Sequence, residues 1–259
     1  MRGGHVRIGV LGGIGPEATG TFYLKLMRRL QELGCVSRNG DYPQVIVNSI
    51  PACEFPERVD PSISIDDVDP MYSQGLLELD AAGVDFIAMA CNTVHLFHRE
   101  LQSRVRAPVI DLREAVRAEL LRRNIRRYVV LGTPWTIEMG LYDFEDEGLE
   151  VLRVDPADLE VLYGAIYSFN VGRDVERGAD ALEHMARRYL GAGADVVILG
   201  CTEVSLMLSG RALPSVDTMN VLVDATVERF CAMRDGRVPE DRGRTARSRA
   251  RQLRTTFIL

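Results

Sequence analysis

Lysine is almost absent from this sequence: of the 31 basic residues, 30 are arginine, and Lys25 is the one lysine. Enzymes that use pyridoxal phosphate hold it as a Schiff base on a lysine, and P-loop nucleotide sites use a lysine for phosphate. Lys25 lies within "FYLKLMRRL", a pattern typical of a surface helix far from any predicted strand end. The scarcity of lysine argues against both classes, and we expect no cofactor.

Long apolar segments are also missing. No apolar run approaches the roughly 20 residues that a membrane-spanning helix needs. The stretch "VRIGVLGGIG" is short, contains glycines and lacks the cleavage pattern of a signal peptide. With 46% apolar residues and a net charge of −6, the 259 residues can bury one large core or two modest ones. We expect a cytoplasmic protein with neither a membrane nor a nucleic-acid partner.

The cysteines form no recognisable disulfide framework or metal-binding pattern. They are five, an odd number, and none stands in a CxxC arrangement. Their positions are 35, 53, 91, 201 and 231. Among the four histidines, His95 and His98 have metal-ligand spacing, but no third ligand accompanies them. We expect free thiols and no metal site, with Cys35, Cys53 and Cys231 as packing or surface residues.

Short apolar strands alternate with helical patterns along the chain. The predicted strands are 6–11, 43–50, 84–91, 107–112, 127–132, 149–154 and 194–201. Helical patterns are present at 17–33, 66–82, 156–169, 174–191 and about 218–234. Apolar strands that alternate with helices in this way predict parallel sheets covered on both faces, which is an α/β fold.

The two halves of the sequence resemble each other. "IGVLGGIGP" matches "YVVLGTPWT", and "AAGVDFIAMACNTVHLF" matches "GAGADVVILGCTEVSLM". We infer an internal duplication into two similar domains, each a mostly parallel sheet flanked by helices, with the active site in the interdomain cleft. The predicted first domain comprises 1–112 with 216–235, the second 113–215, and an arginine-rich C-terminal extension 236–259.

Cys91 and Cys201 each follow a buried strand and precede a helix, in matching positions of the duplication. Ligands bind beyond the carboxyl ends of strands in such sheets, and a helix N-terminus lowers the pKa of a thiol. If the domains face each other, the two thiols flank one cleft. A thiolate on one side then removes a proton from a carbon while the other thiol protonates the opposite face, which inverts a stereocentre. The alternative is a pair of inert buried cysteines.

Short stretches in order along the chain carry a family resemblance. They are "IGVLGGIGPEAT" (8–19), "PER" (56–58), "ACNTVH" (90–95), "VLGT" (130–133) and "GCTEVSL" (200–206). Together they resemble the aspartate/glutamate racemase family, and the aspartate racemases within it in particular. The resemblance implies two α/β domains, catalysis by Cys91 and Cys201 as the two bases, no metal or pyridoxal phosphate, and a homodimer that takes a small amino-acid substrate.

The resemblance also implies contacts to that substrate. Those to the substrate carboxylate are Asn92, Thr93 and Thr202. Ile14 and Thr133 match the two loops around the substrate, and Arg58 matches the basic residue that meets an acidic side chain. Glu203 follows the second cysteine as in the family, where it either orients groups at the site or favours the helix start.

One segment departs from the family pattern and leaves the substrate open. Aspartate racemases carry a lysine after an "IYE"-type helix, whereas "IYSFNVGRD" (166–174) is one residue shorter and offers Arg173 at a displaced position. Arginine and lysine contacts are not interchangeable. The resemblance implies aspartate or glutamate as the substrate. The missing lysine makes a non-acidic amino acid the alternative.

Other activities are possible on the same scaffold. One is a related cysteine-dependent enzyme, such as a maleate-type isomerase, a hydantoin racemase or a malonate decarboxylase. A non-catalytic binding protein that keeps the cleft is another. A nucleotide-binding module is disfavoured because "GGIGPEAT" does not match GxGxxG and places an acidic residue where phosphate would bind.

Overall fold

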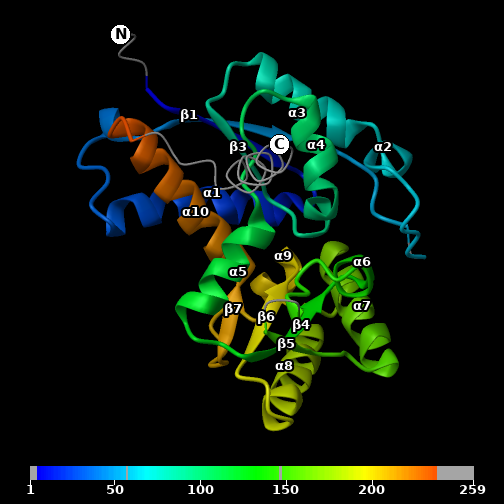
Figure 1. Ribbon diagram of the computed structural model, residues 1–259. Coiled ribbons are helices and arrows are strands. Elements are labelled where there is room, and N and C mark those ends of the chain that lie inside the picture. Colours follow the sequence, from blue (N-terminus) through cyan, green and yellow to red (C-terminus); the bar gives the residue numbers. More distant parts are fainter. Residues whose placement is uncertain (1–4, 57, 146–147, 238–259) are drawn as a thin grey trace, which may run out of the picture.

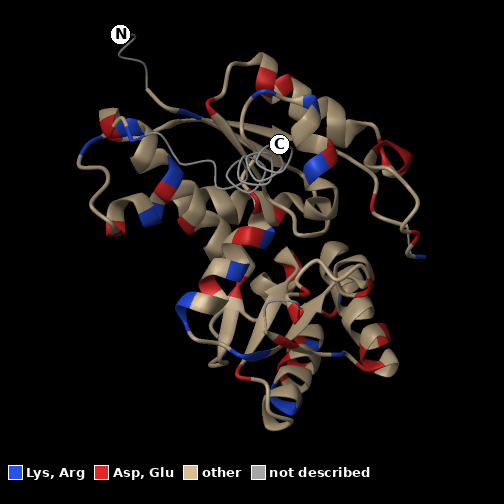
Figure 2. Cartoon of the chain, in the orientation of Figure 1, with Lys and Arg blue, Asp and Glu red and all other residues tan. Residues whose placement is uncertain are grey.

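The computed structural model describes residues 5–56, 58–145 and 148–237, which form an α/β fold in two lobes (Figure 1). All but the first two residues of the predicted arginine-rich extension lie outside these ranges. Acidic and basic side chains are interspersed along the helices of both lobes (Figure 2). Within the described ranges, none of the helices has the length and apolar character that crossing a membrane requires.

The first lobe is built on a parallel sheet in the order β2-β1-β3. Its strands are β1 (Arg7–Gly12), β2 (Gln44–Ser49) and β3 (Phe86–Met89). The predicted strand at 107–112 pairs with β3 at a single parallel bridge between Ile87 and Val109. Pro108 has no N–H to donate, and the Leu112 N–H donates to Nδ1 of His95 (3.4 Å) instead of to the neighbouring strand. The prediction of a full strand there is therefore wrong.

The second lobe repeats this arrangement. Its parallel sheet has the order β5-β4-β6-β7 and consists of β4 (Arg127–Gly132), β5 (Glu150–Leu152), β6 (Val196–Gly200) and β7 (Ser215–Asp217). β4 and β6 correspond to β1 and β3. β7 pairs with β6 at the position equivalent to the bridge between Val109 and Ile87 of β3 in the first lobe. Each of these edge segments begins after a proline and ends in an aspartate that caps a helix, Asp111 or Asp217. The equivalent order supports the inferred duplication.

The helices of the first lobe are α1 (Pro16–Glu32), α2 (Ile65–Val68), α3 (Met71–Ala81), α4 (His98–Arg104) and the 3₁₀ helices η1 (Asn39–Asp41) and η2 (Thr93–Phe97). Those that follow are α5 (Leu112–Arg122), α6 (Pro134–Glu138), α7 (Pro156–Asn170), α8 (Val175–Gly191), α9 (Thr202–Met207) and α10 (Thr218–Arg234). The predicted helix over 66–82 is broken into α2 and α3, because Pro70 disfavours helical geometry at Asp69.

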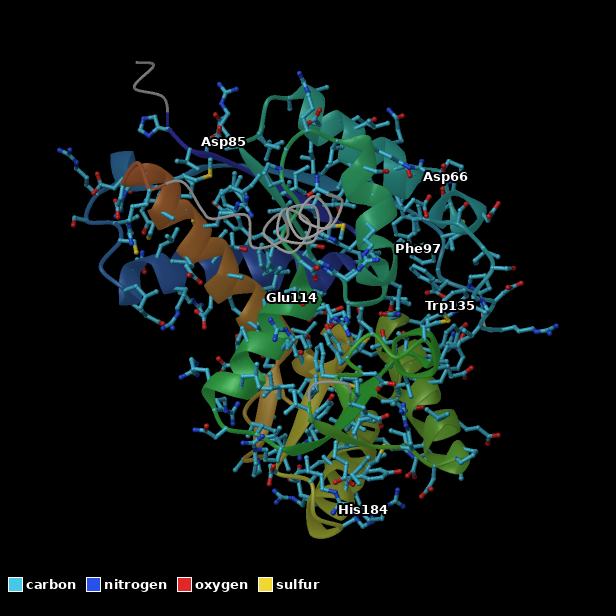
Figure 3. All side chains as sticks on the ribbon, in the orientation of Figure 1. Asp66, Asp85, Phe97, Glu114, Trp135 and His184 are labelled. Atoms are coloured by element: carbon cyan, nitrogen blue, oxygen red, sulfur yellow. The ribbon has the colours of Figure 1, made fainter. Side chains whose placement is uncertain are left out.

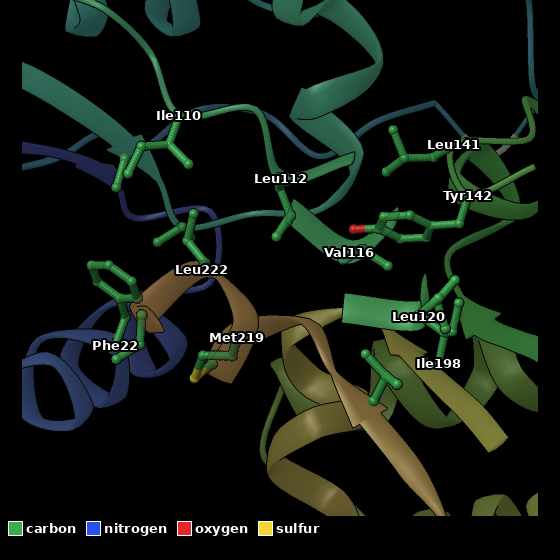
Figure 4. Close-up of a cluster of buried hydrophobic side chains, with 14 of the residues drawn as sticks. Phe22, Ile110, Leu112, Val116, Leu120, Leu141, Tyr142, Ile198, Met219 and Leu222 are labelled. Atoms are coloured by element: carbon green, nitrogen blue, oxygen red, sulfur yellow. The ribbon is translucent and has the colours of Figure 1, made fainter. Parts of the chain in front are cut away.

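Alternate residues of β1, β3, β4 and β6 enter different apolar clusters, which explains why these strands are almost entirely apolar. Ile8, Val10, Tyr128 and Ile198 point into one cluster that α1, α5 and α10 share between the lobes. Figure 4 shows part of it, where side chains of α1, α5, α10 and β6 gather. The opposite faces of the two sheets each have a cluster of their own. The shared cluster joins the lobes through a continuous core.

The last helix, α10, packs beside α1 of the first lobe. Lys25 of α1 donates hydrogen bonds to Asp217 (3.1 Å) and Asn220 (2.8 Å), and Arg29 to Asp224 (2.6 Å). The sole lysine is thus engaged in helix packing. We retain 1–112 with 216–235, and 113–215, as the proposed limits of the two domains.

Candidate active site

A cavity of about 260 Å³ lies at the carboxyl ends of the strands, between the two lobes. Its lining includes eight of the nine residues that the family resemblance assigns to the site. These are Ile14, Cys91, Asn92, Thr93, Thr133, Cys201, Thr202 and Glu203. Arg58 is exposed and outside the lining, so its proposed role stays a prediction. The fold therefore brings both cysteines to one cavity from opposite lobes.

Cys91 follows β3 after Ala90 and is buried, 9% exposed. The backbone N–H groups of Thr93 and Val94, at the start of η2, point to its sulfur and favour the thiolate. Burial acts in the opposite direction and is larger, with a smaller contribution from the charge of Glu203, so the pKa of Cys91 is raised to about 12.

Cys201 follows β6 directly and is the N-cap residue of α9. Its thiol donates a hydrogen bond to Oε2 of Glu203 at 2.7 Å, and the Thr202 hydroxyl donates to the same oxygen at 2.9 Å. Burial, and then the Glu203 carboxylate, raise the pKa of Cys201 well above its ordinary value.

These directions correct the expectation that a helix N-terminus lowers the pKa of each thiol. The N–H groups of Thr93, Val94 and Glu203 do lower it, but removal of the sulfurs from water outweighs them. Cys91 is also followed by a 3₁₀ helix rather than by an α-helix, so it has fewer aligned peptide dipoles behind it. Without a ligand, both groups are held as neutral thiols.

Gly15 makes room for the Glu203 carboxylate. A side chain at this position would collide with Oε1 of Glu203, and the backbone φ of +57° is in the region that favours glycine. The loop between β1 and α1 therefore packs closely on the acid that contacts Cys201. Gly15 and Glu203 come from different lobes, so this contact is part of the junction around the cavity.

Hydroxyl and amide groups form a second polar cluster in the cavity wall. Thr93 Oγ1 lies 3.0 Å from Thr133 Oγ1 and 3.3 Å from Thr136 Oγ1, and the Thr133 hydroxyl also donates to Thr136 at 3.1 Å. Asn92 accepts a hydrogen bond from the Tyr142 hydroxyl, which fixes its amide. Because Thr93 is in the first lobe and Thr133 in the second, this cluster can receive one anionic group from both sides.

Aromatic residues close another side of the cavity. The Phe55 ring lies 5.5 Å from Trp135 and 5.7 Å from Tyr72 between ring centroids. Trp135 also lies 6.5 Å from Phe97 across the lobe junction (Figure 3). The Trp135 indole N–H donates to the Pro56 carbonyl at 2.7 Å. This bond joins the loop after β2 to the second lobe.

Sequence reasoning missed several residues of the lining. The loop after β2 contributes Cys53, Glu54 and Phe55, and the same rule about strand ends that identified Cys91 applies to β2 and could have found them. Cys53, expected to be a packing or surface residue, is exposed but also lines the cavity. α7 contributes Tyr163, Ile166, Tyr167 and Asn170. The last three belong to the segment 166–174 whose departure from the family pattern left the substrate open, but nothing in the sequence predicts that they line the cavity, because only the packing of α7 brings them there.

His95 and His98 are not part of the lining described here. Their rings are stacked, 6.1 Å apart, and their Nε2 atoms lie 3.3 Å from the Met89 carbonyl and 3.1 Å from the Val109 carbonyl, respectively. Burial, and secondarily His98, lower the pKa of His95 to about 4. The pair thus orders the backbone around the end of β3.

Comparison with known proteins identifies the class as racemases, which are isomerases. The chain belongs to the Asp/Glu/Hydantoin racemase family, whose model matches residues 11–226. It is 30% identical over 231 residues to the broad specificity amino-acid racemase RacX of Bacillus subtilis, covering 87% of this chain and 98% of that protein.

Solved structures of the same kind share the two-lobed fold. An aspartate racemase homologue from Pyrococcus horikoshii is 27% identical with a TM-score of 0.68, covering 86% of this chain and 98% of the other. Picrophilus torridus aspartate racemase is 21% identical with a TM-score of 0.71, covering 87% and 94%, and this likeness concerns the fold alone. The expectations of an α/β fold and of the racemase family are confirmed.

Proposed function

We propose that this protein racemises an amino acid without a cofactor, by proton transfer between Cys91 and Cys201. One observation carries the proposal: two buried thiols, from equivalent positions of two duplicated lobes, line the same cavity. Inversion of a carbon centre needs an acid and a base on opposite faces, and two like groups exchange these roles when the direction reverses. The homodimer implied by the family resemblance stays a prediction.

In this mechanism, polar groups hold the substrate carboxylate and stabilise the carbanion formed at the α-carbon. Asn92, Thr93 and Thr133 present amide and hydroxyl groups at the cavity wall. A thiolate is required on the side from which the proton leaves. Glu203, which accepts the hydrogen of the Cys201 thiol, is positioned to take that proton and generate the thiolate on this side. A protonated Cys91 then supplies a proton to the opposite face.

The charge of the cavity favours a substrate side chain that is not acidic. Among the described lining residues, those with charged side chains are Glu54 and Glu203, both acidic. Arg58 and Arg173, the candidate partners for a substrate carboxylate side chain, are exposed and do not line the cavity. An aspartate side chain would add a negative charge beside two others. The broad specificity of the Bacillus subtilis relative is consistent with this preference.

A screen of single enantiomers without added cofactor tests both the reaction and the substrate. We expect inversion of at least one neutral or basic amino acid, with kcat/KM about tenfold or more above that for aspartate or glutamate, because a tenfold difference needs only about 1.4 kcal/mol. Chiral chromatography measures the product. Arg58→Gln and Arg173→Gln are the matched controls, and each should leave kcat/KM for the preferred substrate unchanged.

Aspartate would be the substrate if it gave the highest kcat/KM and Arg58→Gln or Arg173→Gln lowered that value more than about tenfold. Substituted hydantoins and maleate belong in the same screen, since the family name includes hydantoin racemases. Turnover of these compounds with no inversion of any amino acid would replace the proposed reaction by the corresponding alternative.

A further inference from the structure

Two cysteines remote in sequence lie together at the far end of the α1–α10 pair. The two helices run parallel, because their contacts keep a constant offset: Lys25 with Asn220 and Arg29 with Asp224 are both 195 residues apart. Cys35, just after α1, and Cys231, in the last turn of α10, continue this series at an offset of 196. Helix packing therefore places the two thiols opposite each other.

The two sulfur atoms are closer than ordinary packing allows. Their separation is 2.8 Å, whereas even carbon atoms in contact are about 3.5–4.0 Å apart, and a disulfide bond is about 2.05 Å long. Both side chains are partly exposed, so a small reagent can reach them. The sulfurs need to approach each other by only about 0.75 Å to reach the length of a disulfide bond.

The positively charged side chain of Arg234 lies near Cys35 and Cys231. Arg234 donates a hydrogen bond to the Cys35 carbonyl, and its charge lowers the pKa of Cys231 against the larger effects of burial and of Cys35, which raise it to about 11. A guanidinium beside a thiol stabilises the thiolate, which is the species that attacks a disulfide. The proximity of the two sulfurs therefore provides the geometry for thiol–disulfide exchange, and Arg234 partly offsets the effects that keep Cys231 protonated.

We propose that Cys35 and Cys231 form an intramolecular disulfide that links the end of α1 to the end of α10. The oxidant is a low-molecular-weight disulfide such as oxidised glutathione. One protein thiolate attacks it and releases one thiol, and the second protein thiolate then displaces the other. Two electrons pass from the protein sulfurs to the oxidant, whose halves leave as two thiols carrying the two protons. This proposal does not depend on the reaction catalysed.

The disulfide would link α10, whose first residues lie close to the main cavity, to the end of α1. A small void of about 10 Å³ behind that cavity is lined by Cys91 and Thr202 together with Thr218 and Met219 at the start of α10. The bond would also close a loop of nearly the whole described chain. Closure of so long a loop restricts the unfolded chain strongly, and for a protein of this size we expect the melting temperature to rise by about 10 °C.

The test is to equilibrate the full chain in mixtures of reduced and oxidised glutathione, block free thiols by alkylation, and map the peptides by mass spectrometry. We expect a peptide containing Cys35 to be joined to one containing Cys231, and the melting temperature to rise with the linked fraction. Cys35→Ser and Cys231→Ser should each abolish both effects. Cys53→Ser, which changes an exposed cysteine outside the pair, should preserve them.

Two results would overturn the proposal. One is full alkylation of Cys35 and Cys231 in the most oxidising mixture. The other is linkage of Cys53, Cys91 or Cys201 in place of the pair. A Cys35–Cys231 link that left the melting temperature unchanged would confirm the bond and contradict only its expected stabilising effect.

Discussion

Replacing Cys91 or Cys201 by serine will lower kcat/KM for racemisation by at least about a thousandfold. A serine hydroxyl is a far weaker acid than a thiol and provides no usable base at neutral pH. Both substitutions act on both enantiomers, because interconversion of enantiomers has an equilibrium constant of unity and kcat/KM must be equal in the two directions. Chiral chromatography at several substrate concentrations measures the effect.

Cys53→Ser is the matched control for this prediction. Cys53 lines the same cavity but is exposed and has no equivalent at a strand end of the second lobe. We expect this variant to retain activity within about threefold of the wild type, as is usual for a surface change of less than about 0.7 kcal/mol. Circular dichroism and the melting temperature confirm that each variant folds. If either Cys91→Ser or Cys201→Ser kept a tenth of the activity or more, the two-cysteine mechanism would be wrong.

Glu203→Gln will lower kcat by about a hundredfold, because the amide keeps the size of the side chain but cannot accept the proton of Cys201. The substitution will also change the pH dependence of kcat/KM. Burial and the charge of Glu203 raise the pKa of Cys201, so the thiolate fraction of the free enzyme, and with it kcat/KM, increases with pH. Removal of the charge lowers that pKa, and the rising part of the profile should move to lower pH.

The pH profile separates a proton-transfer role of Glu203 from a structural one. Glu54→Gln is the matched control: Glu54 lines the same cavity, and no hydrogen bond to either Cys91 or Cys201 is described for it. With a neutral substrate, Glu54→Gln should change neither kcat nor the profile. A Glu203→Gln variant that stayed within about twofold of the wild-type kcat, with an unshifted profile, would show that the carboxylate acts only on the helix start.

Much of the fold could be predicted because buried parallel strands have a simple signature. The predicted strands at 6–11 and 127–132 agree with β1 and β4 to within one residue, and the matching segments that contain Cys91 and Cys201 indicate the duplication. The errors arose where one residue decides the backbone. Pro70 divides a helical pattern into α2 and α3, and Pro108 together with the hydrogen bond from Leu112 to His95 reduces a predicted strand to one bridge.

The candidate site was predictable only as far as strand ends determine it. Cys91 and Cys201 were found because each ends an apolar run, whereas Tyr163 and Tyr167 come from within a helix whose placement depends on tertiary packing. The direction of the thiol pKa shifts was missed because helix position is visible in sequence and burial from water is not. The proximity of Cys35 and Cys231 likewise depends on the packing of α1 and α10.

The most direct test of the two-cysteine mechanism measures deuterium incorporation at the α-carbon when only a small fraction of the substrate has been converted. The preferred substrate, as one enantiomer, is incubated with the wild-type protein in D₂O and stopped at low conversion, and both enantiomers are separated and analysed by mass spectrometry. Because the proton leaves to one thiol and the new one arrives from the other, we predict deuterium at the α-carbon of the product and none in the remaining substrate. Equal deuterium in both enantiomers from the earliest times would mean that a single base serves both faces, and would contradict the account.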